Sequence, residues 1–208
     1  MNDILINLIN VSKQIEQQYV LEDINLTIER GKAYGVVGEI KSGKTMLLRA
    51  VVGLTYITSG EIIKSNNLKL GAFLEAPGFL PEYTGFSNLK LLSAIQGKIS
   101  DNEIRDAMLR SGLDYNESKK VKDFSADMLH KLAIAQAIMS CPDLLVLDEP
   151  TEELDRESTK NIRKLMLQEK QRETAILISS QSIEEIDFLC DVVYKIENGK
   201  LKTITQNS

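Results

Sequence analysis

Residues 38–45, with the sequence GEIKSGKT, constrain the fold of this chain more than any other segment. They match the pattern G-x-x-x-x-G-K-[ST], in which the backbone N–H groups of a glycine-rich loop surround a phosphate group. The apolar run 33–37 precedes the loop and suits a buried parallel strand. Apolar residues at helical spacing follow it as far as Gly53. This order of strand, loop and helix predicts an α/β fold, and an ordinary glycine-rich turn is the weaker alternative.

The chemistry of this loop points to a nucleoside triphosphate with Mg²⁺. Lys44 would place a positive charge between the β- and γ-phosphates, and the hydroxyl of Thr45 could bind Mg²⁺. The helix that follows would direct the positive end of its dipole at the same anion. Lys41 adds a second cation to the loop. The predicted nucleotide-binding residues here are Gly38, Glu39, Ile40, Lys41, Ser42, Gly43, Lys44, Thr45 and Met46.

The second half of a nucleotide site is predicted at residues 144–149. Four apolar residues are followed there by Asp148 and Glu149. On a buried parallel strand, both carboxylates would lie at the carboxyl-terminal edge, where such sheets bind ligands. Asp148 could hold Mg²⁺, directly or through water, and Glu149 could orient and deprotonate an attacking water. The alternative is a strand that meets solvent at an acidic turn, and the phosphate loop upstream disfavours it.

The remaining pattern predicts a β-rich beginning, a helical middle and an α/β end. Ser100 and Glu103 form a capping box for one helix, and a similar pattern predicts a helix that begins at Ser182. Asn198 and Gly199 predict a two-residue hairpin turn. The predicted strands cover 24–29, 61–64, 68–74, 143–147, 174–178, 192–196 and 201–204, and helical character extends over about 87–140 and 156–170.

Composition narrows the class of protein. The 208 residues are 43% hydrophobic and contain no obvious linker, which suits one domain. The formal net charge of −5 offers no basic field for a nucleic acid, so no nucleic-acid partner is expected. No apolar run approaches the roughly 20 residues of a membrane span, and a signal peptide is not evident. Cys141 and Cys190 are expected to be buried, reduced thiols.

The order of these motifs resembles the ATP-binding subunit of an ABC transporter over essentially the whole chain. The phosphate loop, the sequence LLVLDEP and residues 151–155 occur where that family has its landmarks. Residues 75–89 are similar to a loop of bacterial ATPases for antimicrobial-peptide and lantibiotic export or immunity, the bacitracin-type subgroup. Glu75 takes the place of the glutamine with which most of the family senses Mg²⁺ and the γ-phosphate. The resemblance therefore makes Glu75 a candidate catalytic and metal-binding residue.

The resemblance implies a P-loop NTPase (RecA-like) α/β core with an antiparallel β layer and an inserted helical subdomain. In a single domain, 1–208, the core would cover about 1–77 and 141–208, and the helical subdomain about 78–140. The implied protein is a cytoplasmic ATPase, peripheral on the inner face of the cell membrane. It would bind ATP and Mg²⁺, power a membrane-spanning permease and pair with a second ATP-binding subunit, identical or different. The transported substrate and its direction stay open.

Two motifs depart from the family pattern. The signature sequence, typically LSGGQ, reads FSADM at 124–128. Ser125 is retained as a candidate nucleotide contact, but Asp127 replaces a glycine. The Asp127 carboxylate would repel a γ-phosphate about 4–6 Å away by roughly 3–4 kcal/mol, so we expect its side chain to rotate outward. Gln181 stands at the switch position of a histidine and is a candidate catalytic residue that can donate an N–H but carries no charge.

Further departures leave several functions open. Ile15 stands where an aromatic residue usually stacks on adenine, and Tyr19 could replace it as a nucleotide contact. His130 is interpreted as an ordinary helix-surface residue, because a lone histidine has no partner for metal or triad chemistry. An active transport ATPase is the leading hypothesis, and a degenerate subunit with weak ATPase activity, acting in regulation or with a second ABC subunit, is the alternative. A repair or translation ATPase is disfavoured by the single cassette, and a GTPase by the lack of an N-K-x-D motif.

Overall fold

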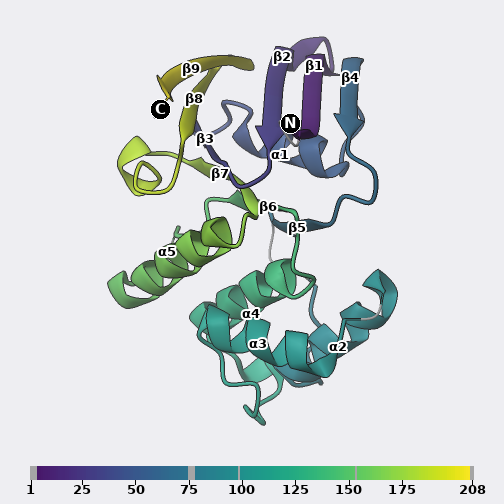
Figure 1. Cartoon of the computed structure of the whole chain (residues 1–208), viewed down its shortest axis with the longest axis vertical. Coiled ribbons are helices and arrows are strands. Elements are labelled where there is room, and N and C mark those ends of the chain that lie inside the picture. Colours follow the sequence, from purple (N-terminus) through teal and green to yellow (C-terminus); the bar gives the residue numbers. More distant parts are fainter. Residues whose placement is uncertain (1–3, 75–77, 98, 153, 207–208) are drawn as a thin grey trace.

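The structure is a computed structural model that describes residues 4–74, 78–97, 99–152 and 154–206. A six-stranded sheet with the order β5-β6-β7-β3-β8-β9 lies at its centre (Figure 1). Neighbouring strands in it are parallel except for β8 and β9, which form the predicted hairpin. The strands are β3 (Ala33–Val37), β5 (Leu70–Phe73), β6 (Leu144–Asp148), β7 (Ala175–Ser180), β8 (Val192–Glu197) and β9 (Lys200–Gln206).

An antiparallel sheet of three strands, with the order β2-β1-β4, forms a second layer. Its strands are β1 (Ile4–Ile15), β2 (Gln18–Glu29) and β4 (Ser59–Lys64). Buried and exposed residues alternate over much of β2, as expected for a sheet with one face on the core. The predicted strand 61–64 lies wholly within β4, and β5 forms part of the predicted strand 68–74, but the two belong to different sheets, because β4 pairs with β1 and β5 pairs with β6.

Five α-helices surround the strands in the described part of the chain. Helices α2, α3 and α4 gather at the end of the molecule away from the antiparallel layer (Figure 1). The predicted capping box is confirmed at the start of α3, where Ser100 accepts from the Glu103 N–H and Glu103 accepts from the Ser100 N–H. The helices are α1 (Lys44–Val52), α2 (Gly85–Gln96), α3 (Asp101–Ser111), α4 (Ala126–Ile138) and α5 (Arg156–Gln171).

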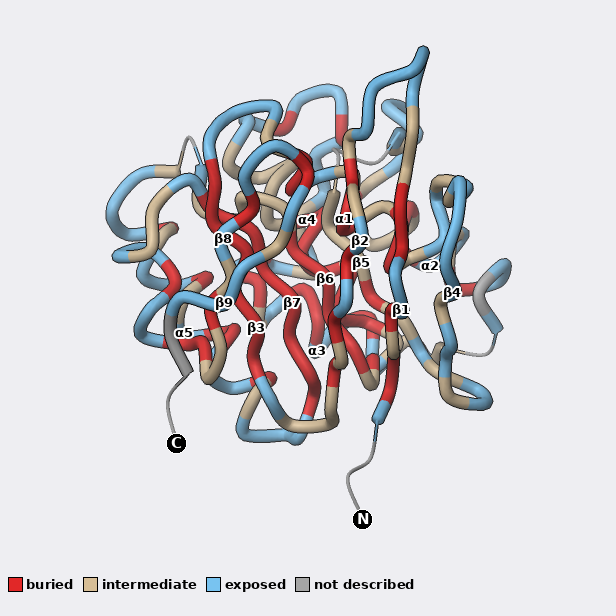
Figure 2. The backbone as a smooth tube through the Cα atoms, turned by 90° about the horizontal axis from the view of Figure 1, so that it is seen from above, coloured by how far each residue is buried: buried red, intermediate tan, exposed pale blue. Residues whose placement is uncertain are grey.

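The inner strands β3, β6 and β7 of the central sheet are buried on both faces, and they form the red centre of Figure 2. Successive residues of β6 enter different hydrophobic clusters. Leu144 and Val146 pack in the cluster that contains α1 and the antiparallel layer, whereas Leu145 and Leu147 pack in the cluster that contains α3, α4 and α5. Because side chains alternate across a strand, an apolar run such as this one packs against the layers on both faces of the sheet. This packing fixes the carboxyl-terminal end of β6, where Asp148 lies.

Two expectations about local structure are wrong. The predicted helix after Ser182 is only a 3₁₀ turn, Ile183–Glu185, because Ile186 and Leu189 enter the core at once and the chain must reach β8. Cys141 is exposed, since it lies in the turn between α4 and β6, while Cys190 is buried as expected.

Among the described residues, no helix is both long enough and apolar enough to span a membrane.

Candidate nucleotide-binding site

The phosphate loop connects the end of β3 to the start of α1. Gly43 has a φ of 113°, and a Cβ there would lie 2.8 Å from the carbonyl oxygen of Val20. A Cβ at Gly38 would lie 2.6 Å from the carbonyl oxygen of Ile196. Since side chains with a Cβ cannot approach backbone so closely, both positions require glycine. The loop therefore keeps its shape through backbone geometry, and α1 begins directly after it at Lys44.

Lys44 is the buried cation of this loop, with only 6% of the residue exposed. Its ammonium donates to the carbonyl oxygen of Gly38 at 2.7 Å and to that of Glu39 at 3.2 Å. It also lies 3.2 Å from Oε1 of Glu149. A buried ammonium is stabilised only while oxygens surround it. Phosphate oxygens could take over the position of the Glu149 carboxylate, so the pair marks where an anion fits.

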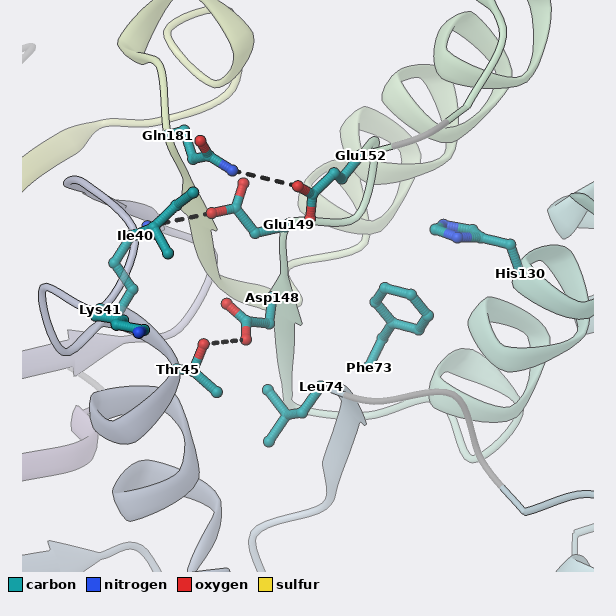
Figure 3. A pocket seen from close by; sticks show the side chains of 11 residues that line it. Ile40, Lys41, Thr45, Phe73, Leu74, His130, Asp148, Glu149, Glu152 and Gln181 are labelled. Atoms are coloured by element: carbon teal, nitrogen blue, oxygen red, sulfur yellow. Dashed lines mark hydrogen bonds and ion pairs between the residues drawn. The ribbon is translucent and has the colours of Figure 1, made fainter. Parts of the chain in front are cut away.

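Thr45 and Asp148 meet between α1 and the end of β6. The Thr45 hydroxyl donates to Oδ2 of Asp148 at 2.6 Å, although 103 residues separate the two (Figure 3). The hydroxyl of Ser179, on β7, donates to the other oxygen of Asp148. One hydroxyl and one carboxylate are a sparse donor set of hard oxygens. Mg²⁺ commonly takes only one or two protein oxygens and completes its octahedron with phosphates and water, so this set fits Mg²⁺.

Glu149 follows Asp148 and faces the same pocket. Burial raises the pKa of its carboxyl above the ordinary value, and the neighbouring Lys44 ammonium opposes that effect. A carboxyl group with a raised pKa is a better proton acceptor than an exposed one, which suits a general base. The geometry also leaves Glu149 close to where Lys44 would meet a phosphate.

The pocket joins the phosphate loop to residues from four other segments. Gln181, which follows β7, donates from Nε2 to Oε1 of Glu152 at 3.2 Å (Figure 3). Both side chains lie beside Glu149, so the predicted switch residue is near the predicted base. The described lining residues are Ile40, Lys41, Lys44, Thr45, Phe73, Leu74, His130, Asp148, Glu149, Glu152 and Gln181.

A second pocket adjoins the loop on the side of the antiparallel layer. It is lined by Val20, Met46 and Arg49 together with residues of the loop. The predicted adenine contact Tyr19 is not among its described lining residues, and 53% of Tyr19 is exposed on β2. Ile15 is 45% exposed at the end of β1. A base bound beside the loop would therefore meet aliphatic side chains first.

Two further predicted site residues lie elsewhere or cannot be placed. Ser125 caps α4, because its hydroxyl accepts from the Met128 N–H, and it is not among the described lining residues of either pocket. Glu75 lies outside the described residues.

Two residues of α4 make contacts that the sequence did not indicate. The Asp127 carboxylate, which we expected to rotate outward, is oriented by Lys131 at 2.6 Å and by the Ser158 hydroxyl at 2.6 Å, from both of which it accepts. His130 is not an ordinary surface residue, since it is partly buried, lines the pocket and lies with Nε2 2.8 Å from the carbonyl oxygen of Pro150. Lys131 is four residues from Asp127 on the same helix, but Ser158 and Pro150 lie beyond β6 in the sequence, so no local pattern could indicate the contacts with those two residues.

A phosphate loop between β3 and α1, with carboxylates at the end of β6 in the same parallel part of the sheet, defines a P-loop NTPase. The model of the ABC transporter family matches residues 21–152. A similar relative is the ABC transporter ATP-binding protein YybJ of Bacillus subtilis (strain 168), 42% identical over 96% of this chain and 95% of that protein. The chain therefore belongs to the ABC transporter family, as one of its ATP-binding ATPase subunits.

The subgroup and the fold are also matched. The bacitracin transport ATP-binding protein BcrA of Enterococcus faecalis is 33% identical over 92% of this chain and 66% of that protein. The dimeric structure of MJ0796, a bacterial ABC transporter cassette, superposes with a TM-score of 0.87 over 98% of this chain and 100% of that chain, at 22% identity. The sequence expectation of a bacitracin-type ABC protein with a P-loop NTPase fold is thereby confirmed, and nothing in the comparisons favours a degenerate subunit.

Proposed function

We propose that this chain binds Mg²⁺-ATP in the pocket between the phosphate loop and the end of β6, hydrolyses it, and so powers peptide export or immunity through a membrane permease. The convergence of Lys44, Thr45, Asp148 and Glu149 in one pocket carries the proposal, because two motifs about a hundred residues apart in sequence supply complementary groups.

Each side chain has one role in this proposal. Lys44 would release Glu149 and bind the β- and γ-phosphates. Thr45 and Asp148 would hold Mg²⁺, which neutralises charge on the phosphates. Glu149 would then orient the attacking water and accept its proton. Gln181 would donate its amide N–H towards the γ-phosphate, and Glu75 would add a further Mg²⁺ contact.

A second ATP-binding subunit is part of the proposal. The Ser125 hydroxyl and the first turn of α4 are not among the described lining residues of the pockets of their own chain, so we take them to be available to a nucleotide in a partner's site. The partner could be identical or different. The Lys131 and Ser158 contacts of Asp127 reduce the repulsion that this carboxylate would exert on a γ-phosphate. A symmetric pair is therefore less disfavoured than the sequence suggested.

The permease is proposed to dock beside residues 79–83, which keeps the protein at the inner face of the membrane. Leu80 is 47% exposed and Tyr83 is 49% exposed, whereas Phe79 packs against the core. Exposed apolar side chains close together mark interaction surfaces. Leu80→Glu with Tyr83→Glu should abolish co-purification with the co-encoded permease and leave ATP binding intact. Undiminished co-purification would place the permease elsewhere.

The proposal is tested by ATP affinity in two lysine variants of the same loop. Lys44→Ala should weaken binding of a fluorescent ATP analogue by at least about tenfold, because charge-assisted hydrogen bonds contribute about 1.5–3 kcal/mol. Lys41→Ala is the matched control, since Lys41 is exposed, and should weaken binding less than about fivefold. Unchanged affinity in a folded Lys44→Ala protein would refute the site.

A further inference from the structure

The turn that carries Glu149 is strained. Glu149 has a φ of 48°, in the left-handed region that favours glycine, although it has a full side chain. It also precedes Pro150, whose ring further restricts the residue before it. Such a conformation is destabilising for a residue with a Cβ and persists only where its surroundings impose it. A strained carboxylate residue at the end of β6 therefore requires neighbours that hold it.

Hydrogen bonds on both sides hold this turn. The Glu149 N–H donates to the hydroxyl of Ser179 at 3.1 Å, and the Glu152 N–H closes the turn onto the carbonyl oxygen of Glu149 at 3.1 Å. The carbonyl of Pro150 points instead towards α4, where Nε2 of His130 lies 2.8 Å away. A carbonyl oxygen can only accept, so Nε2 must carry the proton. Among the described residues, His130 is the side chain that forms a hydrogen bond with that carbonyl oxygen.

His130 is itself fixed in place. Its ring lies 4.7 Å from the ring of Phe73, at an interplanar angle of 52°. Phe73 ends β5 and pairs in register with Leu147 of β6, so the sheet that positions Glu149 also supports the imidazole. Figure 3 shows His130 reaching from α4 towards the segment that carries Glu149 and Glu152. Burial lowers the pKa of His130 below its ordinary value, so the ring is neutral at neutral pH.

The same end of α4 makes a second contact with this segment. Asp127, one turn before His130, accepts from the Ser158 hydroxyl in the first turn of α5. Residues at i and i+3 of a helix share a face. One face of α4 therefore contacts the segment 150–158 near both of its ends, which is the arrangement expected of a clamp.

We propose that His130 is a positioning residue that holds the strained turn at Glu149, by donating its Nε2–H to the carbonyl oxygen of Pro150, and thereby aims the Glu149 carboxylate into the pocket. The inference rests on the proposed role of Glu149 as the base. It links α4, which carries the altered signature sequence, to the catalytic step rather than to nucleotide affinity.

The test separates the hydrogen bond from the packing of the ring. His130→Phe keeps a ring against Phe73 and removes the donor, whereas His130→Gln loses the ring and keeps a donor at a similar reach. His130→Phe should lower kcat about fivefold to tenfold, the size of one hydrogen bond, with ATP affinity within about twofold of native. His130→Gln should retain most of the native kcat. A lower kcat in His130→Gln than in His130→Phe would overturn the inference. So would a loss of ATP affinity in His130→Phe as large as its loss of turnover.

Because the chain contains one histidine, its imidazole nitrogens can be observed by NMR without assignment by mutation. At about pH 8, ¹⁵N shifts should report a neutral ring protonated at Nε2, and a ring protonated at Nδ1 would contradict the inference even if the variants fail to fold. Glu149→Gln serves as the comparator for turnover. Native turnover in Glu149→Gln would overturn both the proposed base and this inference. If Glu149→Gln loses turnover while His130→Phe keeps the native rate, only the inference is overturned.

Discussion

The phosphate loop and the amino-terminal end of α4 are held in place by different forces. In the loop, backbone geometry decides the shape, and Gly38 and Gly43 sit where neighbouring carbonyl groups leave no space for a Cβ. At α4, side chains decide it, since Asp127 and His130 reach partners 31 and 20 residues away in sequence. A backbone-built loop tolerates no change of residue type at its glycines. A side-chain clamp can be altered gradually, so turnover can be tuned there without loss of nucleotide binding.

The largest expected effect is at Gly43. Gly43→Ala forces a left-handed φ on a residue with a Cβ and brings that atom against the Val20 carbonyl. We expect the free energy of unfolding to fall by about 2–4 kcal/mol, measured by urea denaturation. Gly97→Ala is the matched control, because Gly97 has a φ of 94° but nothing within 4 Å of its Cβ position. Equal losses at the two glycines would show that conformation alone, without the close approach, matters in the loop.

A smaller effect is expected at Asp127. Despite opposition from burial, hydrogen bonds from Lys131 and Ser158 lower the pKa of this carboxyl below its ordinary value of 3.8. Asp127→Ala should therefore lower the free energy of unfolding by about 0.5–1 kcal/mol at pH 7, as for partly exposed pairs. Asp106→Ala is the control, since it removes an exposed carboxylate beside Arg110 on α3 whose guanidinium keeps its contact with Glu169, and it should cost less.

The pH dependence of that difference follows from the sign of the shift. A carboxyl group whose pKa is lower in the folded chain stabilises the fold above its unfolded pKa, and the contribution disappears as the pH falls through the folded pKa. The difference in stability between native protein and Asp127→Ala should therefore be full at pH 7 and shrink below the ordinary value of 3.8. A difference that stays constant into acid would mean that the charge of Asp127 contributes nothing.

The two regions also differ in how far sequence alone describes them. The phosphate loop, the capping box at Ser100 and the hairpin at 198–199 depend on neighbours within a few residues, so each can be recognised from its local sequence pattern. The strands β3, β6 and β7 can also be recognised from the sequence, because strands that are buried on both faces of a parallel sheet consist of continuous apolar runs.

Tertiary contacts explain what the sequence did not reveal. His130 and Asp127 occupy ordinary positions in a helical pattern, and packing of α4 against β5 and α5 brings His130 onto Phe73 and Asp127 onto Ser158. The turn after Ser182 has a good capping residue, but core packing of Ile186 ends it early. Proximity of Thr45 to Asp148 was inferable, because both follow strands of one parallel sheet whose carboxyl-terminal ends meet at one edge.

The central claim is that the phosphate loop supplies ATP affinity and the turn at Glu149 supplies turnover. The most direct test measures ATP affinity and phosphate release on one preparation of Glu149→Gln, beside native protein assembled with its permease. Glutamine keeps the shape and removes the basicity, so affinity should be retained or increased while phosphate release falls about 100-fold or more. Native phosphate release, or loss of affinity in step with turnover, would contradict the account.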